Sequence, residues 1–338
     1  MKALVQIVLV LVFHLASLPL DAESAEKLQK TRVGYGVITL NNAPWWIAQD
    51  RGIFRDEGLD GEALFVRGSP TVIKSLLAGE IQAGYSGIPA MAPAIAGGAG
   101  LVAVALPSNR LDNLLVSREP VKDPKSLRGK KFAVSSLGGS SEAATRIALE
   151  QLGVDPNSIT VVQVGGSRER SLALSKGSVD VALLAKTEYL SDPELQAFHL
   201  VYDLTKSNYE FGFTALVVTR EFATERRKNV LGIIKAFYRG IWYLQKNKDD
   251  GLKVAATHLR NPDMELLRKQ WHHVAFDYFQ PIPYPTEAGI MNAIKVVAQR
   301  TPKASTLKAS DVADPSFVEE LVKTGFFKQS KEVGNSRS

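Results

Sequence analysis

The sequence contains no cysteine among its 338 residues. Disulfide scaffolds, thiolate zinc sites, iron–sulfur clusters and cysteine nucleophiles are therefore excluded. Aromatic residues are few, at 8%, and neither sign of charge dominates, because 41 Lys and Arg residues stand against 35 Asp and Glu residues. The net charge of +6 is thus spread over a mixed, solvated surface, and we expect no nucleic-acid partner. A hydrophobic content of 45% excludes disorder as the main state, and the length predicts about two domains.

Long hydrophobic runs are also absent, except at the N-terminus. Lys2 precedes the apolar run ALVQIVLVLVF (3–13), and small residues follow near Ala22 and Ser24. A positive start, a short apolar region and small residues form the pattern of a secretory signal peptide. We therefore expect residues 1–24 to be a signal peptide cleaved after Ala22 or Ser24, with the mature protein exported. Polar residues and a proline interrupt the run, which disfavours the alternative of a retained membrane anchor.

Short β-like runs alternate with helix-like runs from about residue 31 to residue 218. This alternation predicts an α/β fold with parallel sheets that are covered by helices. Beyond residue 220 the β-like runs stop, and the segment 221–247 carries one apolar stripe at helical spacing. We expect helices from there to about residue 324. The β-like runs lie at residues 32–37, 62–67, 81–86, 101–106, 113–118, 131–136, 159–164, 179–184, 198–203 and 213–218.

Ten β-like runs are many for one sheet, so the sequence favours two smaller α/β lobes. The charged, proline-containing segment 116–131 and the polar run 203–212 resemble linkers. We therefore expect residues 25–118 plus 207–338 to form lobe 1 and residues 119–206 to form lobe 2. Two crossovers between lobes are the geometry of a hinge.

Motifs of the common enzyme classes are missing. The sequence has no G-x-S-x-G, no Walker P-loop, no G-x-G-x-x-G after a β-like run and no H-E-x-x-H. The histidines outside the leader fit surface or capped core positions, and no pair of carboxylates has a spacing that forces an acid–base couple. We therefore expect a protein that is not an enzyme, with no catalytic residue, no metal ligand and no cofactor.

Glycine- and hydroxyl-rich turns follow several of the β-like runs. In open α/β sheets ligands bind outside the carboxyl ends of the strands, where the backbone N–H groups of helix N-termini favour anions and polar oxygens. One such turn needs no ligand, since the same residues cap helices, but six in register favour a binding cleft. The turns lie at residues 39–48, 68–71, 84–89, 135–143, 164–168 and 185–188.

Several side chains near these turns suggest how the ligand is bound. Trp45 and Trp46 open the first helix, and we expect one to pack in the core and the other to form an aromatic wall for the ligand. Glu142 either offsets the positive end of its helix, which disfavours a strongly anionic ligand, or points outward. Four cations lie close enough to strand ends to pair with a carboxylate or sulfonate: Arg110, Arg168, Arg170 and Lys186.

Four segments, in the right order, resemble one family. APWWIAQDRGIFRDEGLDGE (43–62), SLLAGEIQAGYSG (75–87), SLRGKKFAVSSLGGSS (126–141) and LALSKGSVDVALL (172–184) resemble the nitrate/sulfonate/taurine group of periplasmic solute-binding proteins. That group includes proteins that bind the pyrimidine precursor of thiamine. The resemblance runs from about residue 32 to residue 245, with one departure at Gln82, where the family usually has Asp.

The resemblance implies a two-lobe periplasmic-binding-protein fold of type II, the Venus flytrap, with a helical C-terminal region. It also implies a monomer that captures a small-molecule solute and delivers it to an ABC importer, whose permease lies in the inner membrane. The ligand-binding residues that it implies are Asn41, Asn42, Ala43, Trp45, Gly68, Ser69, Ser86, Gly87, Gly138, Gly139, Ser140, Ser141 and Thr187.

Two alternative functions and several classes of ligand stay open at this point. An enzyme on the same fold, related to thiamine-pyrimidine synthesis, would need a positioned nucleophile or acid–base group, and a sensor lobe would regulate a membrane partner without transport. A sulfonate, a carboxylate, nitrate or bicarbonate, and a heterocycle all fit a cleft of amides and hydroxyls. Glu142 and the tryptophans favour an organic solute over a small inorganic anion.

Overall fold

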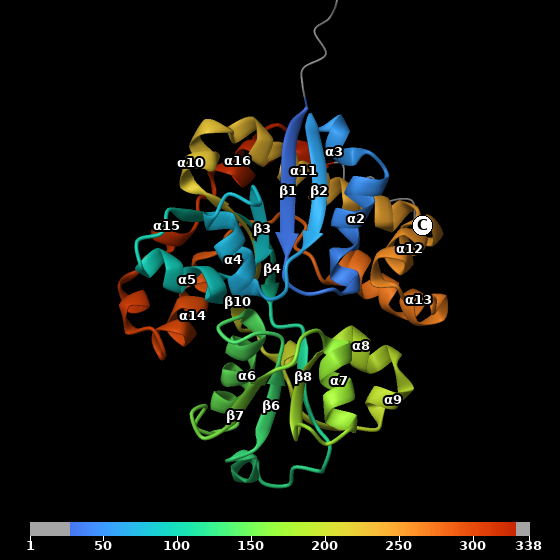
Figure 1. Ribbon diagram of the computed structural model, residues 1–338, viewed down its shortest axis with the longest axis vertical. Coiled ribbons are helices and arrows are strands. Elements are labelled where there is room, and N and C mark those ends of the chain that lie inside the picture. Colours follow the sequence, from blue (N-terminus) through green and yellow to red (C-terminus); the bar gives the residue numbers. More distant parts are fainter. Residues whose placement is uncertain (1–27, 329–338) are drawn as a thin grey trace, which may run out of the picture.

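The computed structural model describes residues 28–328, so the expected leader at residues 1–24 lies outside the described part. Two five-stranded sheets form the centres of two lobes (Figure 1). The first sheet has the order β2-β1-β3-β10-β4, and its strands are β1 (Gln29–Tyr35), β2 (Leu59–Phe65), β3 (Ala83–Ser86), β4 (Leu101–Arg110) and β10 (Glu210–Thr219). The second has the order β7-β6-β8-β5-β9, and its strands are β5 (Asn113–Ser117), β6 (Lys131–Val134), β7 (Thr160–Gln163), β8 (Val181–Ala185) and β9 (His199–Asp203).

All ten β-like runs of the sequence are strands, but the sheets are mixed rather than parallel. β10 runs antiparallel to β3 and β4, and β5 runs antiparallel to β8 and β9. These two strands are the first that the chain forms after each crossing between the lobes. The chain enters each sheet there from the side that faces the other lobe, so the direction of the strand is reversed.

The crossovers differ from the expected boundary after residue 118. The strand β5 pairs with β8 and β9 of the second sheet, so the chain already leaves the first lobe at Leu111 and Asp112. The charged segment 118–130 instead lies within the second lobe, between β5 and β6. The return crossover runs between β9 and β10, within the polar run 203–212.

Helices cover both sheets. The first lobe has α2 (Ala43–Asp50), α3 (Ile53–Asp56), α4 (Ser69–Leu77) and α5 (Ile88–Ala96), and the second has α6 (Ser140–Gln151), α7 (Ser167–Ser175), α8 (Lys186–Ser191) and α9 (Pro193–Gln196). The helices that follow β10 all pack on the first lobe (Figure 1). They are α10 (Arg220–Glu225), α11 (Arg227–Lys246), α12 (Lys248–Leu259), α13 (Met264–His272), α14 (Glu287–Ala298), α15 (Ala309–Val312) and α16 (Ser316–Lys323).

The core of the first lobe lies where α2 packs against α11. The apolar stripe that the sequence predicts on α11, which includes Ile233, Phe237 and Ile241, is buried there. Gly240 permits the close approach of the two helices, because a Cβ at this position would lie 2.2 Å from the carbonyl oxygen of Pro44. Burial of this stripe therefore joins the C-terminal helices to the first sheet.

The two lobes contact each other directly. The Ser140 hydroxyl at the start of α6 donates to the carbonyl of Phe213 on β10, at 2.9 Å, and Gln270 of α13 donates to the Ser191 hydroxyl of α8, also at 2.9 Å. One apolar cluster runs from α5 and α14 of the first lobe to α6 of the second. The described structure is thus a closed arrangement of the lobes.

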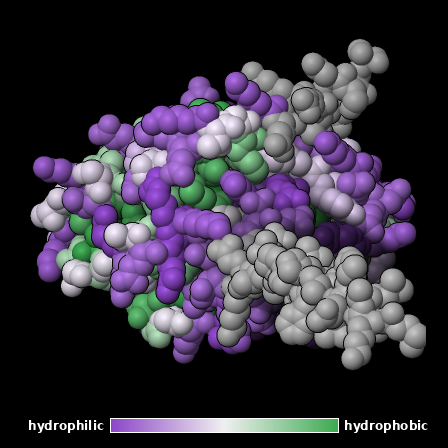
Figure 2. Space-filling model, turned by 90° about the horizontal axis from the view of Figure 1, so that it is seen from above, coloured by the Kyte–Doolittle hydropathy of each residue, from purple (hydrophilic) through white to green (hydrophobic). Residues whose placement is uncertain are grey.

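The surface of the first lobe is mainly hydrophilic when it is seen from the end away from the second lobe, with apolar residues in small patches (Figure 2). Within residues 28–328, no helix has both the length and the apolar character needed to span a bilayer.

Candidate ligand-binding site

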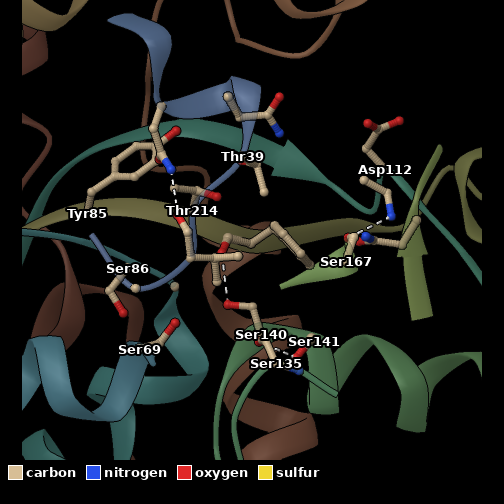
Figure 3. A pocket seen from close by; sticks show the side chains of 18 of the residues that line it. Thr39, Ser69, Tyr85, Ser86, Asp112, Ser135, Ser140, Ser141, Ser167 and Thr214 are labelled. Carbon is tan, nitrogen blue, oxygen red and sulfur yellow. Dashed lines mark hydrogen bonds between the residues drawn. The ribbon is translucent and has the colours of Figure 1, made fainter. Parts of the chain in front are cut away.

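A cavity of about 120 Å³ lies between the lobes. Most of the side chains that line it carry hydroxyl or amide groups (Figure 3). The first lobe contributes Gly36, Val37, Thr39, Asn41, Asn42, Ser69, Tyr85, Ser86, Gly87, Phe213, Thr214 and Tyr278. The second lobe and the first crossover contribute Asp112, Asn113, Ser135, Ser140, Ser141, Ser167, Arg170 and Ala185.

The N-terminus of α6 forms one wall of this pocket. The turn before the helix closes on itself, since the backbone N–H of Ser135 donates to the Ser141 hydroxyl at 2.9 Å and the two hydroxyls lie 2.6 Å apart. Gly138 in this turn has a φ of +74°, a left-handed conformation that favours glycine. The helix begins with Ser140 and Ser141, which both line the cavity, and its first backbone N–H groups have no partner within the helix.

Several buried polar atoms of the pocket have no hydrogen-bond partner. The Ser86 hydroxyl, the Tyr85 hydroxyl and Oδ1 of Asn113 are in this state, although their residues are at least nine-tenths buried. A buried polar atom without a partner costs about 1–3 kcal/mol. All three residues line the cavity, so each of these atoms lies within the walls of the site and lacks a partner in the protein.

Arg170 is a buried cation in the wall formed by the second lobe. Its side chain donates from Nε to the Leu183 carbonyl at 2.7 Å, from Nη1 to the Gly165 carbonyl at 2.5 Å and from Nη2 to the Ser167 hydroxyl at 2.8 Å. Burial lowers the pKa of Arg170 to about 10, so the guanidinium keeps its charge at neutral pH. Burial also raises the pKa of the neighbouring Glu188 carboxyl.

Asp112 lies in the first crossover and carries the carboxylate of the pocket. Its Oδ2 lies 2.7 Å from Nε2 of His273, in the π-helical turn His273–Asp277 that follows α13. The Asp112 side chain is 14% exposed. A nearby tyrosine, Tyr278, also lines the cavity, and burial raises its pKa, so it is a neutral hydroxyl at neutral pH.

The chain matches the sequence model of the family described as NMT1/THI5 like over residues 39–250, which is more than half of its length. The chain belongs to this family. Its resemblance to nitrate- and sulfonate-binding proteins is thereby confirmed at the level of the family and of the fold.

Curated relatives of this NMT1/THI5-like protein are distant. A protein of Brucella abortus (strain 2308), named as a candidate binding protein, is 28% identical over 151 residues, or 45% of this chain and 46% of the relative. The chain therefore matches about half the length of that relative. A candidate binding protein of Bacillus subtilis (strain 168), YtlA, is 22% identical over 242 residues, or 70% of this chain and 71% of YtlA.

Solved structures with the same fold cover nearly the whole chain. A protein from Bordetella bronchiseptica RB50 has a TM-score of 0.74 at 19% identity and covers 88% of this chain and 98% of its own. The nitrate-binding NrtA of Synechocystis PCC 6803 has a TM-score of 0.69 at 12% identity, and the match covers 88% of this chain and 89% of NrtA. The aliphatic sulphonate-binding SsuA of Escherichia coli has a TM-score of 0.65 at 17% identity, and the match covers 85% of this chain and 92% of SsuA. The NMT1/THI5-like chain thus has the two-lobe fold of the solute-binding proteins of ABC importers.

The ligand-binding residues expected from the sequence divide into two groups. Those that line the cavity are Asn41, Asn42, Ser69, Ser86, Gly87, Ser140 and Ser141. Those that do not line it are Ala43, Trp45, Gly68, Gly138, Gly139 and Thr187. Ala43 is fully buried, the three glycines shape their turns without facing the cavity, and Thr187 lies on α8, beyond Ala185 at the pocket wall.

The tryptophans require a correction. Trp45 and Trp46 are both fully buried, so neither forms an aromatic wall for a ligand. Trp45 packs between Phe54 and Phe237, at ring-centre distances of 6.2 and 4.4 Å. The aromatic side chains that line the cavity are instead Tyr85, Phe213 and Tyr278.

The position of Glu142 resolves both alternatives that the sequence left open. The side chain neither points outward nor lines the cavity, because it is 3% exposed and folds back onto its own turn. Its Oε2 accepts from the backbone N–H of Gly138 at 2.8 Å, and its Oε1 pairs with Arg146 at 3.0 Å and with Arg300 of the first lobe. Two guanidinium groups therefore compensate its charge.

Among the four cations considered from the sequence, only Arg170 lines the cavity. Lys186 donates to the Thr205 hydroxyl at 2.9 Å instead. Sequence reasoning missed Asp112, Ser167, Thr214 and Tyr278. Ser167 lies within the turn 164–168 that the sequence singled out, and it was open to the same argument as Ser140. No local signal points to Tyr278, which reaches the pocket from beyond the C-terminal helix α13.

Proposed function

We propose that the protein is the solute-binding component of an ABC importer outside the cytoplasm and that it captures a small organic solute in the cavity between its lobes. The observation that carries this proposal is the cavity between the two lobes, which both lobes line mainly with residues that carry hydroxyl or amide groups. The fold, shared with the nitrate- and sulphonate-binding neighbours, supports it. The protein would act as a monomer in the periplasm, without catalysis, and would deliver its solute to a permease in the inner membrane.

Binding would work through closure of the hinge. In the open form the two walls of the pocket are apart and the solute enters. In the closed form the solute contacts both walls, in place of the solvent that they contact in the open form. Buried donors and acceptors without partners, such as the Ser86 hydroxyl, become paired only when a solute is present. The permease would then recognise the closed form.

The first test measures thermal unfolding of protein that has been unfolded and refolded to remove bound solute, against sulfonates, carboxylates, inorganic anions, amino acids and pyrimidines. A ligand at 100 times its Kd adds about 2.7 kcal/mol to the free energy of unfolding. For a chain of this size we expect an upward shift in Tm of about 5–11 °C, at roughly 2–4 °C per kcal/mol. Recovery of the ligand unchanged supports binding, whereas its conversion supports the alternative of an enzyme related to thiamine-pyrimidine synthesis.

Hinge closure has a direct readout, because the chain lacks cysteine and two can be introduced without background. Ile38 follows β1 in the first lobe and Leu137 follows β6 in the second, with exposed fractions of 41% and 48%. Spin labels on Ile38→Cys and Leu137→Cys should move closer when the ligand from the panel is added. A ligand-binding protein whose labels stay at one distance contradicts closure as the mechanism.

The Ser86 hydroxyl should contribute to ligand binding and lower the stability of the ligand-free protein. The change Ser86→Ala removes a buried hydroxyl without a partner, so we expect the ligand-free protein to keep its stability or gain about 1 kcal/mol. Ligand affinity should fall about fivefold, because one hydrogen bond is lost. Calorimetric titration and urea unfolding measure the two effects. Ser135→Ala is the matched control, because that hydroxyl is paired with Ser141 and its loss should destabilise the ligand-free protein.

A further inference from the structure

Ser136 lies at the contact between the two lobes, in the turn after β6 but outside the pocket. Its side chain packs against Gly68 of the first lobe, where a Cβ would lie only 3.2 Å from the Cβ of Ser136. Gly68 has a φ of +87°, which favours glycine, and the missing side chain leaves room for Ser136. Ser136 is 3% exposed in this closed arrangement and does not line the cavity.

The hydroxyl of Ser136 is buried and has no hydrogen-bond partner among the described residues. In an open form, which separates Ser136 from Gly68, water would reach this hydroxyl and form hydrogen bonds with it. Closure therefore removes a polar group from water without giving it a new partner, which opposes closure. The Ser86 and Tyr85 hydroxyls also lack partners, but their residues line the cavity, whereas a solute in the cavity does not contact Ser136.

The turn that carries Ser136 is held within the second lobe. The backbone N–H groups of Leu137, Gly138 and Gly139 all donate to acceptors of that lobe, and the last of them donates to the carbonyl of Ser136 itself. Because three consecutive N–H groups have partners in the same lobe, the turn moves with its lobe. Closure therefore brings Ser136 into contact with Gly68 each time.

Other contacts between the lobes favour closure. The Ser140 hydroxyl donates to the Phe213 carbonyl at 2.9 Å, and the Gln270 amide donates to the Ser191 hydroxyl at 2.9 Å. In the open form these groups would contact water instead. The equilibrium between the two forms thus depends on the difference between such contacts and the groups that oppose them, among which is the Ser136 hydroxyl.

We propose that Ser136 is an affinity-determining residue outside the pocket, whose hydroxyl opposes closure and so weakens the binding of the solute. A smaller fraction of the solute-free protein is closed than without this hydroxyl, and the apparent affinity falls with that fraction. The effect is the same for every solute, because Ser136 does not line the cavity. This inference rests on the proposed function, in which binding requires closure.

The first test is Ser136→Ala, which removes the hydroxyl and keeps the Cβ that packs against Gly68. Spin labels on Ile38→Cys and Leu172→Cys, 41% and 54% exposed in the natural residues, report on closure without adjoining Ser136. In solute-free protein we expect the ratio of closed to open molecules to rise at least about fivefold, which shortens the mean distance between the labels. The affinity for the panel compound that raises Tm most should rise by up to the same factor.

Ser171→Ala is the matched control for this variant. Ser171 is also a buried serine of the second lobe that does not line the cavity. Its hydroxyl donates to the Ser167 carbonyl at 2.8 Å within α7, so the bond does not cross between the lobes. We expect this change to leave the distances between the labels as they are in the natural protein.

A second variant tests the contact itself. Ser136→Cys places a single thiol in a chain that has no other cysteine. Iodoacetamide should modify this thiol at least about tenfold more slowly in protein saturated with the same panel compound than in solute-free protein, because only the open form exposes it. Leu137→Cys is the matched control, since Leu137 is 48% exposed in the closed form, and it should react at nearly equal rates.

Three results would overturn the inference. They are an unchanged or longer distance between the labels in solute-free Ser136→Ala protein, a lower affinity of this variant for the panel compound, and equal reactivity of the Ser136→Cys thiol with and without that compound. The distances in solute-free protein need no ligand, so they decide on Ser136 even if no compound of the panel binds. The proposed function fails separately, if no compound closes the labelled lobes.

Discussion

Replacement of Trp45 by alanine should lower the free energy of unfolding by about 3–5 kcal/mol, the cost typical of removing a large aromatic side chain from a core. Trp45 is fully buried, and its ring contacts Phe54, Phe237 and Tyr85. The cavity left behind would lie in the centre of the first lobe, where α2 and α11 meet. Urea unfolding of the ligand-free protein measures the loss.

Trp45→Phe is the matched control. The indole N–H of Trp45 has no hydrogen-bond partner, so phenylalanine loses no hydrogen bond and keeps an aromatic ring in the same position. We expect less than half of the destabilisation of the alanine variant and a ligand affinity within about threefold of the natural protein. If the Trp45→Phe protein is stable but no longer binds its ligand, Trp45 contributes to the binding site, and its assignment to the core alone is contradicted.

Replacement of Glu142 by alanine should destabilise the second lobe by about 3–5 kcal/mol, because it leaves a buried charge without its partner. Arg146 is 8% exposed on its side chain and pairs with Oε1 of Glu142 at 3.0 Å. The backbone N–H of Gly138, in the turn before α6, loses its acceptor in the same change. Urea unfolding of the ligand-free variant should therefore show a lower midpoint.

Arg300→Gln separates the second role of Glu142 from the first. Arg300 is 55% exposed and follows α14 of the first lobe, so its pair with Glu142 joins the lobes. An exposed partner contributes little to folding, about 0–1 kcal/mol. We expect near-natural unfolding but a larger distance between spin labels at residues 38 and 137 in the absence of ligand. An unchanged distance would show that this ion pair does not hold the lobes closed.

The sequence by itself determined the local elements of the fold. All ten strands and the long helix over 227–246 lie where the β-like runs and the single apolar stripe predict them. The turns after β1, β3 and β6 were also identified correctly as features at the ends of strands, and each contributes residues to the pocket. These features depend on the period of apolar residues and on glycine, serine and proline within a few positions, which a sequence displays directly.

Tertiary structure alone decided the membership of β5 in the second sheet, the burial of both tryptophans and the turn of Glu142 onto Arg146 and Arg300. It also brought His273 and Tyr278 to Asp112, from more than 160 positions along the chain. Pairing partners and burial depend on which surfaces the chain packs together, and no local pattern records that. The pocket therefore combines turns that the sequence predicts with the first crossover, which carries Asp112. The place of Asp112 in the pocket is decided only by the packing of the two lobes.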